Sequence, residues 1–284
     1  MIDPFKITGP TCISFSGGRT SAYMLWRVLQ SNGGLPNEAK VIFANTGRED
    51  EATLKFVNDC AVNWDISITW LEYTATGDGF KVVDFKTAAR DGEPFMEMIV
   101  KERHLPNPMQ RICTSRLKVR TMHKYQRSIG FGDWDQFVGI RADEMRRVVK
   151  LRNKPHPESK NETVVLPLAD AGITVHDVNE FWNSQLFNLE LTTFNGRTLA
   201  GNCDLCFLKP MAQIQSLIQE KPERAIWWAK VEKFAIENLH DKKHAHAMLF
   251  RMDRPSYSQM LQFSKDQTDM FDQNEEAIAC FCGD

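Results

Sequence analysis

The sequence predicts an α/β protein, in which a parallel sheet carries helices on both faces and a mainly helical segment with cysteines follows. Short apolar runs alternate with longer amphipathic stretches through the first half of the chain. The first two runs are each followed by glycine and hydroxyl residues, the positions at which parallel sheets bind ligands. Four of the 7 cysteines form two close pairs after residue 200. We therefore expect an α/β domain over residues 1–200 and a helical segment over residues 201–284.

Four apolar, β-rich runs predict the strands of the sheet. They are residues 12–15, 41–44, 66–71 and 136–139. Strands that are buried on both faces read as continuous apolar runs bounded by turn residues. Because these runs alternate with helical patterns, they indicate βαβ units and a parallel sheet.

Amphipathic spacing predicts the helices. They are expected at residues 20–30, 51–62, 115–128, 174–182 and 222–239. In the first of them, Leu25, Val28 and Leu29 recur at helical spacing on one face. Thr174 and Asp177 form the pattern of a capping box, in which each side chain accepts a hydrogen bond from the backbone of the other.

Composition excludes several classes of protein. Lys and Arg total 35 against 37 for Asp and Glu, a formal net charge of −2, so bulk charge does not indicate nucleic-acid binding. No apolar run approaches the ~20 residues that span a bilayer. The N-terminus lacks the basic and apolar regions of a signal peptide. These features predict a cytoplasmic protein without a membrane partner.

Charge is nevertheless distributed unevenly along the chain. Residues 101–127 contain 8 basic residues and 1 acidic residue, and residues 141–154 contain 6 basic and 2 acidic residues. Residues 266–284 contain 6 acidic residues and no basic residue. Two interpretations stay open: solvated helix faces, or a basic mouth for an anionic substrate.

The segment between the first strand and the first helix reads Ser-Gly-Gly-Arg-Thr-Ser. Glycines allow close approach of the backbone, and a helix N-terminus presents N–H groups to an anion. The segment resembles the PP-loop of the ATP-pyrophosphatase superfamily, which holds the phosphates of an adenine nucleotide; the alternative is a plain strand-to-helix turn. The resemblance implies a nucleotide-binding role for the six residues of the loop, Ser16, Gly17, Gly18, Arg19, Thr20 and Ser21.

Two further segments follow predicted strands and resemble motifs of the phosphoadenosine phosphosulfate (PAPS) reductase family. Asn45, Thr46 and Gly47, with Glu49 and Thr53 downstream, resemble D-T-G…E-T, although Asn45 replaces the aspartate. Residues 139–147 resemble G-x-R-x-x-E-S-x-x-R, with methionine in place of the serine. The resemblance implies nucleotide binding by Asn45, Thr46, Gly47, Gly139 and Arg141.

Two more segments extend the resemblance to about residues 10–185. Residues 111–119 resemble C-C-x-x-x-K-V but contain one cysteine, Cys113, and residues 165–178 resemble P-L…D-V. The chain is thus similar to a PP-loop, Rossmann-like member of the PAPS reductase family.

The remaining cysteines point to metal or redox chemistry, because thiols stay reduced in the cytoplasm. Cys203 and Cys206 form a C-x-x-C, which alone suits a redox pair, half a zinc site or half an iron–sulfur site. In iron–sulfur members of the resembled family, a cysteine equivalent to Cys113 joins such a pair to hold a [4Fe–4S] cluster. Cys280 is then the expected fourth ligand, and a zinc site is the alternative.

The C-terminal tail carries the expected nucleophile. Sulfonucleotide reductases have a catalytic cysteine near the C-terminus in an E-C-G-x-H segment, and Cys282 followed by Gly283 resembles part of it. The roles of Cys280 and Cys282 are interchangeable at this level. Cys12, in a strand, and Cys60, in a helix, are expected in the core.

The resemblance implies an enzyme that binds ATP together with Mg²⁺, cleaves the ATP to AMP and pyrophosphate, and transfers sulfur. The acceptor could be a nucleic acid bound through the basic middle of the chain, with a sulfur donor or a thioredoxin-like reductant as partner. The first alternative is a PAPS or adenosine phosphosulfate reductase that forms sulfite through Cys282. The second is a nucleotide-sensing module without catalysis. A homodimer is a further expectation.

Overall fold

The computed structural model describes residues 3–153, 161–194, 197–239 and 248–272. The chain divides into two compact units. The first comprises Met1–Glu102 and Arg111–Asp204, and the second comprises Arg103–Gln110 and Leu205–Asp284. The domain boundary expected at residue 200 stays a prediction.

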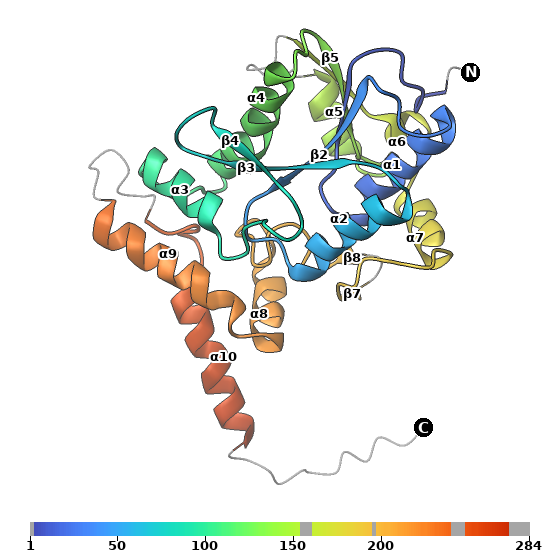
Figure 1. Ribbon diagram of the computed structural model, residues 1–284. Coiled ribbons are helices and arrows are strands. Elements are labelled where there is room, and N and C mark those ends of the chain that lie inside the picture. Colours follow the sequence, from blue (N-terminus) through green and yellow to red (C-terminus); the bar gives the residue numbers. More distant parts are fainter. Residues whose placement is uncertain (1–2, 154–160, 195–196, 240–247, 273–284) are drawn as a thin grey trace, which may run out of the picture. The chain divides into compact units, whose positions relative to one another are not determined.

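A six-stranded sheet forms the centre of the first unit (Figure 1), in the order β4-β3-β2-β1-β5-β6. All neighbouring strands are parallel except β4, which runs antiparallel to β3. The strands are β1 Thr11–Ser14, β2 Ala39–Asn45, β3 Ile68–Tyr73, β4 Phe80–Val83, β5 Trp134–Val138 and β6 Glu162–Val165. The four expected strands are all present, and the predicted α/β fold class is confirmed.

The first strand, β1, occupies the middle of the sheet. Ile13 lies opposite Val41 of β2 and Phe137 of β5, and all three side chains are buried. Because β1 and β5 are parallel neighbours, their carboxyl ends meet at one edge of the sheet. The segments that follow these two strands are therefore brought together.

Helices cover the sheet of the first unit. These helices are α1 Arg19–Asn32, α2 Glu51–Asn63, α3 Glu93–Glu102, the π-helix η1 Thr114–Arg120, α4 Thr121–Ser128, α5 Met145–Asn153, α6 Pro167–Asp170 and α7 Val175–Asn183. A short two-stranded ribbon, β7–β8, is separate from the six-stranded sheet. The ribbon pairs β7 Thr193–Phe194 with β8 Arg197–Thr198. The capping box expected at the start of α7 is present, formed by Thr174 and Asp177.

Alternating side chains assign the helices to the two faces of the sheet. Ile42 and Ala44 of β2 share a buried cluster with Met122 of α4. The intervening Phe43 points the other way, since it packs against Trp70 at a ring distance of 4.8 Å and borders the same space as Val57 of α2. Helices α4 and α2 thus cover opposite faces, as the sequence predicts.

Several elements were not expected from the sequence. The basic stretch at 115–128 is continuous helix, but its first half is the π-helix η1. The edge strand β4 and the short strand β6 have mixed burial, so they lack the apolar run that identifies a strand buried on both faces. Helix α5 contains four basic residues among its nine and buries only Val148, so it lacks the run of core residues that indicates a buried helix face.

The second unit contains three helices among its described residues, α8 Met211–Glu220, α9 Arg224–Asn238 and α10 Tyr257–Asp272. An aromatic cluster forms its core: Trp228 packs on Tyr257 at 5.2 Å and on Phe250 at 4.9 Å between ring centroids. The buried carboxylate of Glu232 accepts hydrogen bonds from the backbone N–H of Tyr257 and of Phe250. Burial raises the pKa of Glu232 to about 7.

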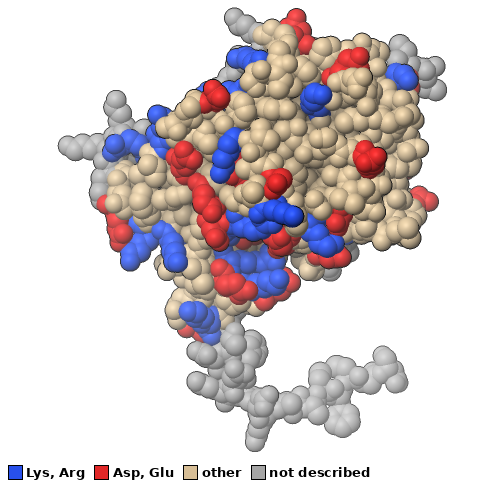
Figure 2. All heavy atoms as spheres, in the orientation of Figure 1, with Lys and Arg blue, Asp and Glu red and all other residues tan. Residues whose placement is uncertain are grey.

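The surface is mixed in charge. Figure 2 shows lysine and arginine side chains interspersed with aspartate and glutamate on the face in view, rather than gathered into one field. Among the described helices, none combines the length and the apolar character that crossing a membrane requires.

Candidate functional site

The loop between β1 and α1 is shaped by Gly17 and Gly18 in different ways. Gly17 has a φ of 74°, and a Cβ there would lie 2.7 Å from Cγ2 of Thr53 and 3.1 Å from Cγ2 of Val57. Gly17 therefore packs the loop tightly on α2. Gly18 caps α1 with an extended conformation, and a Cβ there would meet only the Ser16 hydroxyl, at 3.8 Å.

Hydroxyl groups lock the loop onto the first turn of α1. The Ser21 hydroxyl donates to the carbonyl oxygen of Gly18 at 2.9 Å and accepts from the backbone N–H of Ser16 at 3.2 Å. The two serine hydroxyls are 3.0 Å apart. This bonding holds the loop in position ahead of the first N–H groups of the helix, which have no intrahelical partner.

The segment after β5 closes on the same loop. A Cβ on Gly139 would lie 3.0 Å from the Cα of Ser21, so a glycine is needed for this approach. Arg141 donates from Nη1 to the Thr20 hydroxyl at 3.0 Å. Its Nε and Nη2 bind the two carboxylate oxygens of Asp143 at 2.9 and 3.1 Å, and the bond to Arg141 lowers the pKa of Asp143.

These segments line one pocket of about 360 Å³. Eight of the expected nucleotide-binding residues line it, namely Ser16, Gly17, Gly18, Arg19, Thr20, Ser21, Gly139 and Arg141. The charged residues that line the pocket are three arginines, Arg19, Arg141 and Arg147, and one carboxylate, Glu144. Glu144 itself binds Arg147 and the backbone N–H of Arg141. The pocket therefore carries a net positive charge, which suits an anion.

Thr53 is a pocket residue that sequence reasoning did not place among the candidates. It lines the pocket and is 2% exposed. Its hydroxyl has no hydrogen-bond partner among the described residues, although a buried hydroxyl is usually bonded. Its occurrence in the segment that resembles E-T was the available signal.

The guanidinium of Arg19 binds three residues that lie far from it in the sequence. Its Nε donates to Asn188 at 2.8 Å, its Nη1 to the Thr193 hydroxyl at 2.8 Å and its Nη2 to the carbonyl oxygen of Leu189 at 2.9 Å. The guanidinium thus anchors residues 188–193 beside the pocket. Its direct contact with a nucleotide stays a prediction.

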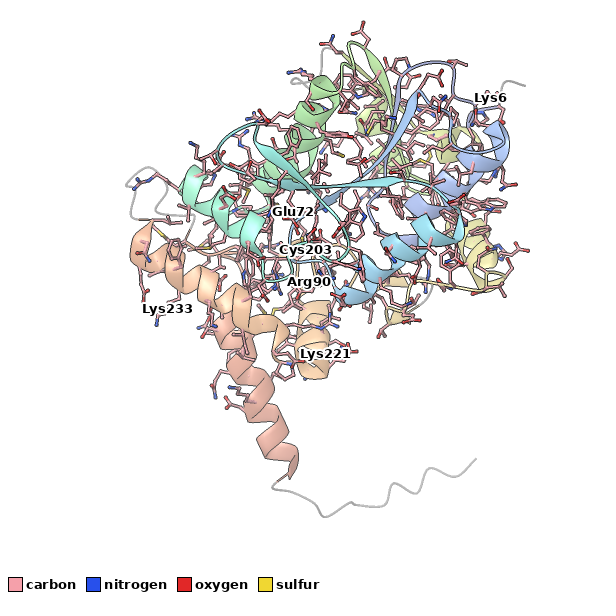
Figure 3. The ribbon with its side chains drawn as sticks, in the orientation of Figure 1. Lys6, Glu72, Arg90, Cys203, Lys221 and Lys233 are labelled. Carbon is pink, nitrogen blue, oxygen red and sulfur yellow. The ribbon has the colours of Figure 1, made fainter. Side chains whose placement is uncertain are left out.

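Asn45, Thr46 and Gly47 are not among the residues that line this pocket. Asn45 is fully buried and donates from Nδ2 to Oε1 of Glu72 at 2.6 Å and to the carbonyl oxygen of Ala89 at 2.9 Å. Glu72 is labelled in Figure 3. This pairing explains the departure from aspartate, because a carboxylate at position 45 would face the carboxylate of Glu72. Nucleotide contact by these three residues stays a prediction.

Thr46 contacts Cys203, one of the expected metal ligands. Its hydroxyl donates to Oε2 of Glu49 at 2.8 Å and lies 3.5 Å from Sγ of Cys203. Cys203 also pairs with Glu49 in an antiparallel bridge. The ion pair between Arg48 and Asp204, at 2.7 Å, fixes the backbone beside it. Cys203 is labelled in Figure 3.

The cysteines are found in three settings. Cys12 and Cys60 are buried, as expected, and burial raises the pKa of Cys12 to about 12. Cys113 and Cys203 are partly exposed in the first unit, and Cys206 is partly exposed in the second. Across the described ranges, no group of three or more His, Cys, Asp or Glu side chains is arranged to hold a metal ion. Cys280 and Cys282 lie outside the described residues.

Comparison with known proteins places the chain in a family. No protein-family model matches it. The chain is 31% identical over 211 residues to the uncharacterized nin region protein ORF290 of Escherichia phage lambda, a match that covers 71% of this chain and 67% of the phage protein. The chain belongs to the ORF290 family.

More distant similarities accompany the membership in the ORF290 family. The chain is 30% identical over 164 residues to the uncharacterized protein MJ0066 of Methanocaldococcus jannaschii, covering 57% of this chain and 29% of that protein. Among solved structures, the U34-tRNA thiolase NcsA of Methanococcus maripaludis, with its [4Fe–4S] cluster, aligns at a TM-score of 0.39 and 14% identity. That alignment covers 98% of this chain and 77% of the thiolase chain, and a similarity of this size assigns neither fold nor function.

Proposed function

We propose that the pocket at residues 16–21 binds the phosphates of an adenine nucleotide and that the chain is a PP-loop enzyme. The observation that carries this proposal is the convergence of two segments on one pocket. The loop after β1 and the Gly139–Arg141 segment after β5 were each expected to bind the nucleotide on separate motifs, and the Arg141–Thr20 hydrogen bond joins them.

The phosphates would be held by three kinds of group. The first N–H groups of α1 point out of the helix N-terminus, where the helix dipole favours an anion. The hydroxyls of Thr20 and Thr53 supply further hydrogen-bonding groups. The guanidiniums of Arg141 and Arg147 would neutralise phosphate charge.

The remainder of the nucleotide would contact the apolar side of the pocket. Val175, Val178 and Leu189 line it, and Val178 and Leu189 are buried. Apolar side chains of this kind suit the faces of a purine ring, whereas polar groups fix its orientation. Adenine rather than another base is proposed because of the resemblance to PP-loop enzymes.

The proposed reaction begins at the α-phosphorus of ATP. An oxygen of the acceptor attacks this phosphorus, the bond to the β-phosphate oxygen breaks, and pyrophosphate leaves with the bonding electrons. The loop N–H groups would stabilise the charge that develops on pyrophosphate, and Mg²⁺ bound to ATP would supply further positive charge there. A reduced sulfur nucleophile from a sulfur donor then bonds to the acceptor carbon, and AMP leaves with the oxygen.

The acceptor and the sulfur carrier are proposed from the resemblance. The resemblance favours a nucleic-acid acceptor and assigns sulfur chemistry to Cys282. A [4Fe–4S] cluster requires thiolate ligands in one place, and the described cysteines do not form such a group. The proposed reaction therefore proceeds without a cluster. Iron, zinc and acid-labile sulfide analysis of anaerobically purified protein decides between cluster, zinc and neither.

Product analysis tests the proposed function. The full chain is incubated with ATP or with PAPS, in the presence of total nucleic acid as acceptor and sulfide as sulfur donor, and pyrophosphate, AMP and sulfite are measured. Release of pyrophosphate and AMP from ATP is expected, and the Gly18→Val variant should release neither. Release of sulfite from PAPS alone would overturn the proposal in favour of a reductase. Binding without any product would favour a nucleotide sensor.

A further inference from the structure

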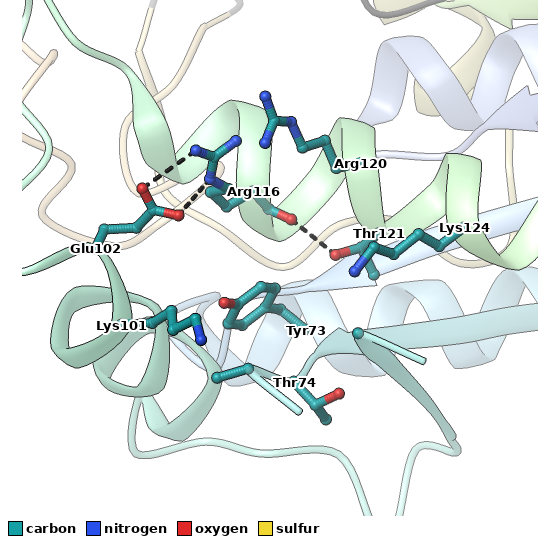
Figure 4. Close-up of a pocket in the computed structure, with 10 residues that line it drawn as sticks. Tyr73, Thr74, Lys101, Glu102, Arg116, Arg120, Thr121 and Lys124 are labelled. Atoms are coloured by element: carbon teal, nitrogen blue, oxygen red, sulfur yellow. Dashed lines mark hydrogen bonds and ion pairs between the residues drawn. The ribbon is translucent and has the colours of Figure 1, made fainter. Parts of the chain in front are cut away.

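A second pocket, distinct from the loop at residues 16–21, lies in the first unit beyond the carboxyl end of β3 (Figure 4). Its volume is about 220 Å³. It is lined by residues from the end of β3 and the following turn, from α3, from η1 and from α4. None of its lining residues was expected to bind the nucleotide, so the proposed function gives this pocket no role.

Cations dominate the lining of this pocket. Lys101 of α3, Arg116 and Arg120 of η1 and Lys124 of α4 stand against one carboxylate, Glu102. A second carboxylate, Glu97, accepts a hydrogen bond from the backbone N–H of Ala75 beside the pocket, at 2.7 Å. Among the described residues in and beside the pocket, these four positive charges and two negative charges sum to +2. The pocket therefore favours an anion, and a dianion balances it fully.

One of these cations is fixed by its bonds, and two others are exposed lysines that line the pocket. Arg116 binds both oxygens of Glu102, at 2.5 and 3.2 Å, which orients its guanidinium. Figure 4 shows Lys101 and Lys124 reaching toward Tyr73 from opposite sides. Neither lysine has an ion-pair partner in the described part of the chain.

The backbone is shaped to admit Lys124. Gly79 has a φ of 79°, and a Cβ there would lie 1.9 Å from Nζ of Lys124 and 3.0 Å from its Cδ and Cε. The side chain of Lys124 thus lies directly over a glycine in the turn between β3 and β4. Any larger residue at position 79 would push the ammonium group out of this position.

Tyr73 adds a phenol, which can donate a hydrogen bond, to the lining of the pocket. Tyr73 is 8% exposed, and its pKa is raised by burial and by the carboxylates of Glu102 and Glu97, so its phenol keeps the proton. Such a combination of ammonium groups, an oriented guanidinium and a phenol is suited to a phosphoryl group, whose oxygens accept several hydrogen bonds.

We propose that this second pocket binds a phosphate group through Lys101, Arg116, Arg120 and Lys124. This proposal does not depend on the nucleotide site. The phosphate could belong to a small phosphorylated molecule or to a nucleic-acid strand, since both present the same group. It gives a definite location to the basic stretch that the sequence showed at residues 101–127.

Calorimetric titration with inorganic phosphate tests the proposal. The measurement uses the full chain with the Gly18→Val substitution, which is expected to prevent phosphate from binding at the loop of residues 16–21. Lys101→Met and Lys124→Met are each expected to weaken phosphate binding about tenfold, the factor that corresponds to ~1.4 kcal/mol. Lys233→Met is the matched control, because its side chain is 75% exposed and it lies in the second unit. Equal affinities for all three variants would overturn the proposal.

Substitution of Gly79 provides a second, independent test of the proposal. Gly79→Ala should weaken phosphate binding, because its Cβ displaces Lys124. Gly77→Ala should not, since Gly77 also has a positive φ, 59°, but a Cβ there meets nothing within 4 Å. An equal loss in both alanine variants would trace the effect to backbone strain and contradict the role of Lys124.

The source of the phosphate is distinguished by two ligands. Ribose 5-phosphate and a single-stranded oligonucleotide are titrated into the same proteins. Similar affinities indicate a small phosphorylated ligand, whereas much tighter oligonucleotide binding that Lys101→Met and Lys124→Met both weaken indicates a nucleic-acid strand. Binding of either ligand that neither lysine variant changes counts against the pocket.

Discussion

Arg141 and Thr20 are 121 residues apart in the sequence, and a hydrogen bond of 3.0 Å joins the guanidinium of one to the hydroxyl of the other. Because Thr20 lies in the first turn of α1 and Arg141 follows β5, this bond ties together the two segments that form the pocket. The same arginine is held by Asp143 through two further bonds. Its position is thus set before any ligand arrives, which reduces the ordering cost of binding.

Replacing Arg141 tests its contribution to binding. Arg141→Ala should weaken nucleotide binding by about 1.5–3 kcal/mol, the range for hydrogen bonds to charged groups. The difference from wild type should shrink in high salt, because phosphate contacts that are open to solvent are screened. Arg152→Ala is the control, since Arg152 is 53% exposed and pairs with Asp170 outside the pocket. Calorimetry at two salt concentrations measures both effects, and an equal loss in the control would contradict a specific role.

The tight packing around Gly17 predicts that substitution there affects the stability of the fold. Gly17→Ala should lower the free energy of unfolding by about 1–3 kcal/mol, because its φ is positive and its Cβ would strike Thr53. Thr53→Ser, which removes Cγ2 and keeps the hydroxyl, should recover the steric part of this loss in the double variant. Urea unfolding measures each free energy. Additive losses in the double variant would show that the contact with Thr53 is not the cause.

Asn45 and Glu72 form a buried pair that should not tolerate a second carboxylate. Asn45→Asp should lower the free energy of unfolding by about 3 kcal/mol or more, the cost of an uncompensated buried charge. The loss should be larger at neutral than at acid pH, where carboxyl groups are protonated. Adding Glu72→Gln should restore part of the stability by reversing the donor and the acceptor. Urea unfolding of the four proteins at two pH values gives the coupling energy, and a coupling near zero would count against the pairing.

Glu232 predicts a pH dependence of stability in the second unit. Its pKa is raised from 4.5 to about 7 by burial, so between these values the folded chain holds a proton that the unfolded chain has released. The free energy of unfolding should therefore fall as pH rises from about 4.5 to about 7 and change little above that range. Glu232→Gln removes the titration, and its unfolding should lack this decline. The same slope in both proteins would assign it to another group.

The sequence predicted the parts of the fold and site that are set by local patterns. The strand, the glycines and the helix start around Ser16–Ser21 are contiguous, so one short segment specifies that part of the pocket. Gly139 and Arg141 were expected from the resemblance of residues 139–147 to a family motif, and they line the same pocket because the strand before them is parallel to β1. The α/β class followed from the same alternation of strands and helices.

Other features depend on contacts between residues that are distant in the sequence. Arg19 reaches Asn188, 169 residues away, and no local pattern predicts that partner. Asn45 departs from the aspartate of the motif because its amide donates a hydrogen bond to Glu72 on the neighbouring strand. The basic stretch at 101–127 was visible, but Tyr73 and Gly79, which shape the second pocket, come from a different part of the chain.

The nucleotide site is tested most directly by calorimetric titration of a non-hydrolysable ATP analogue into wild type, Gly18→Val and Gly132→Val. Gly18 adopts an extended conformation with open space at its Cβ, so valine should fill the phosphate position while the urea midpoint stays unchanged. Gly132 also has no neighbour within 4 Å of an added Cβ and precedes β5, at the opposite edge of the sheet. Wild type and Gly132→Val should bind the analogue equally, and Gly18→Val should not bind it detectably. Wild-type affinity in a folded Gly18→Val variant would contradict phosphate binding at this loop.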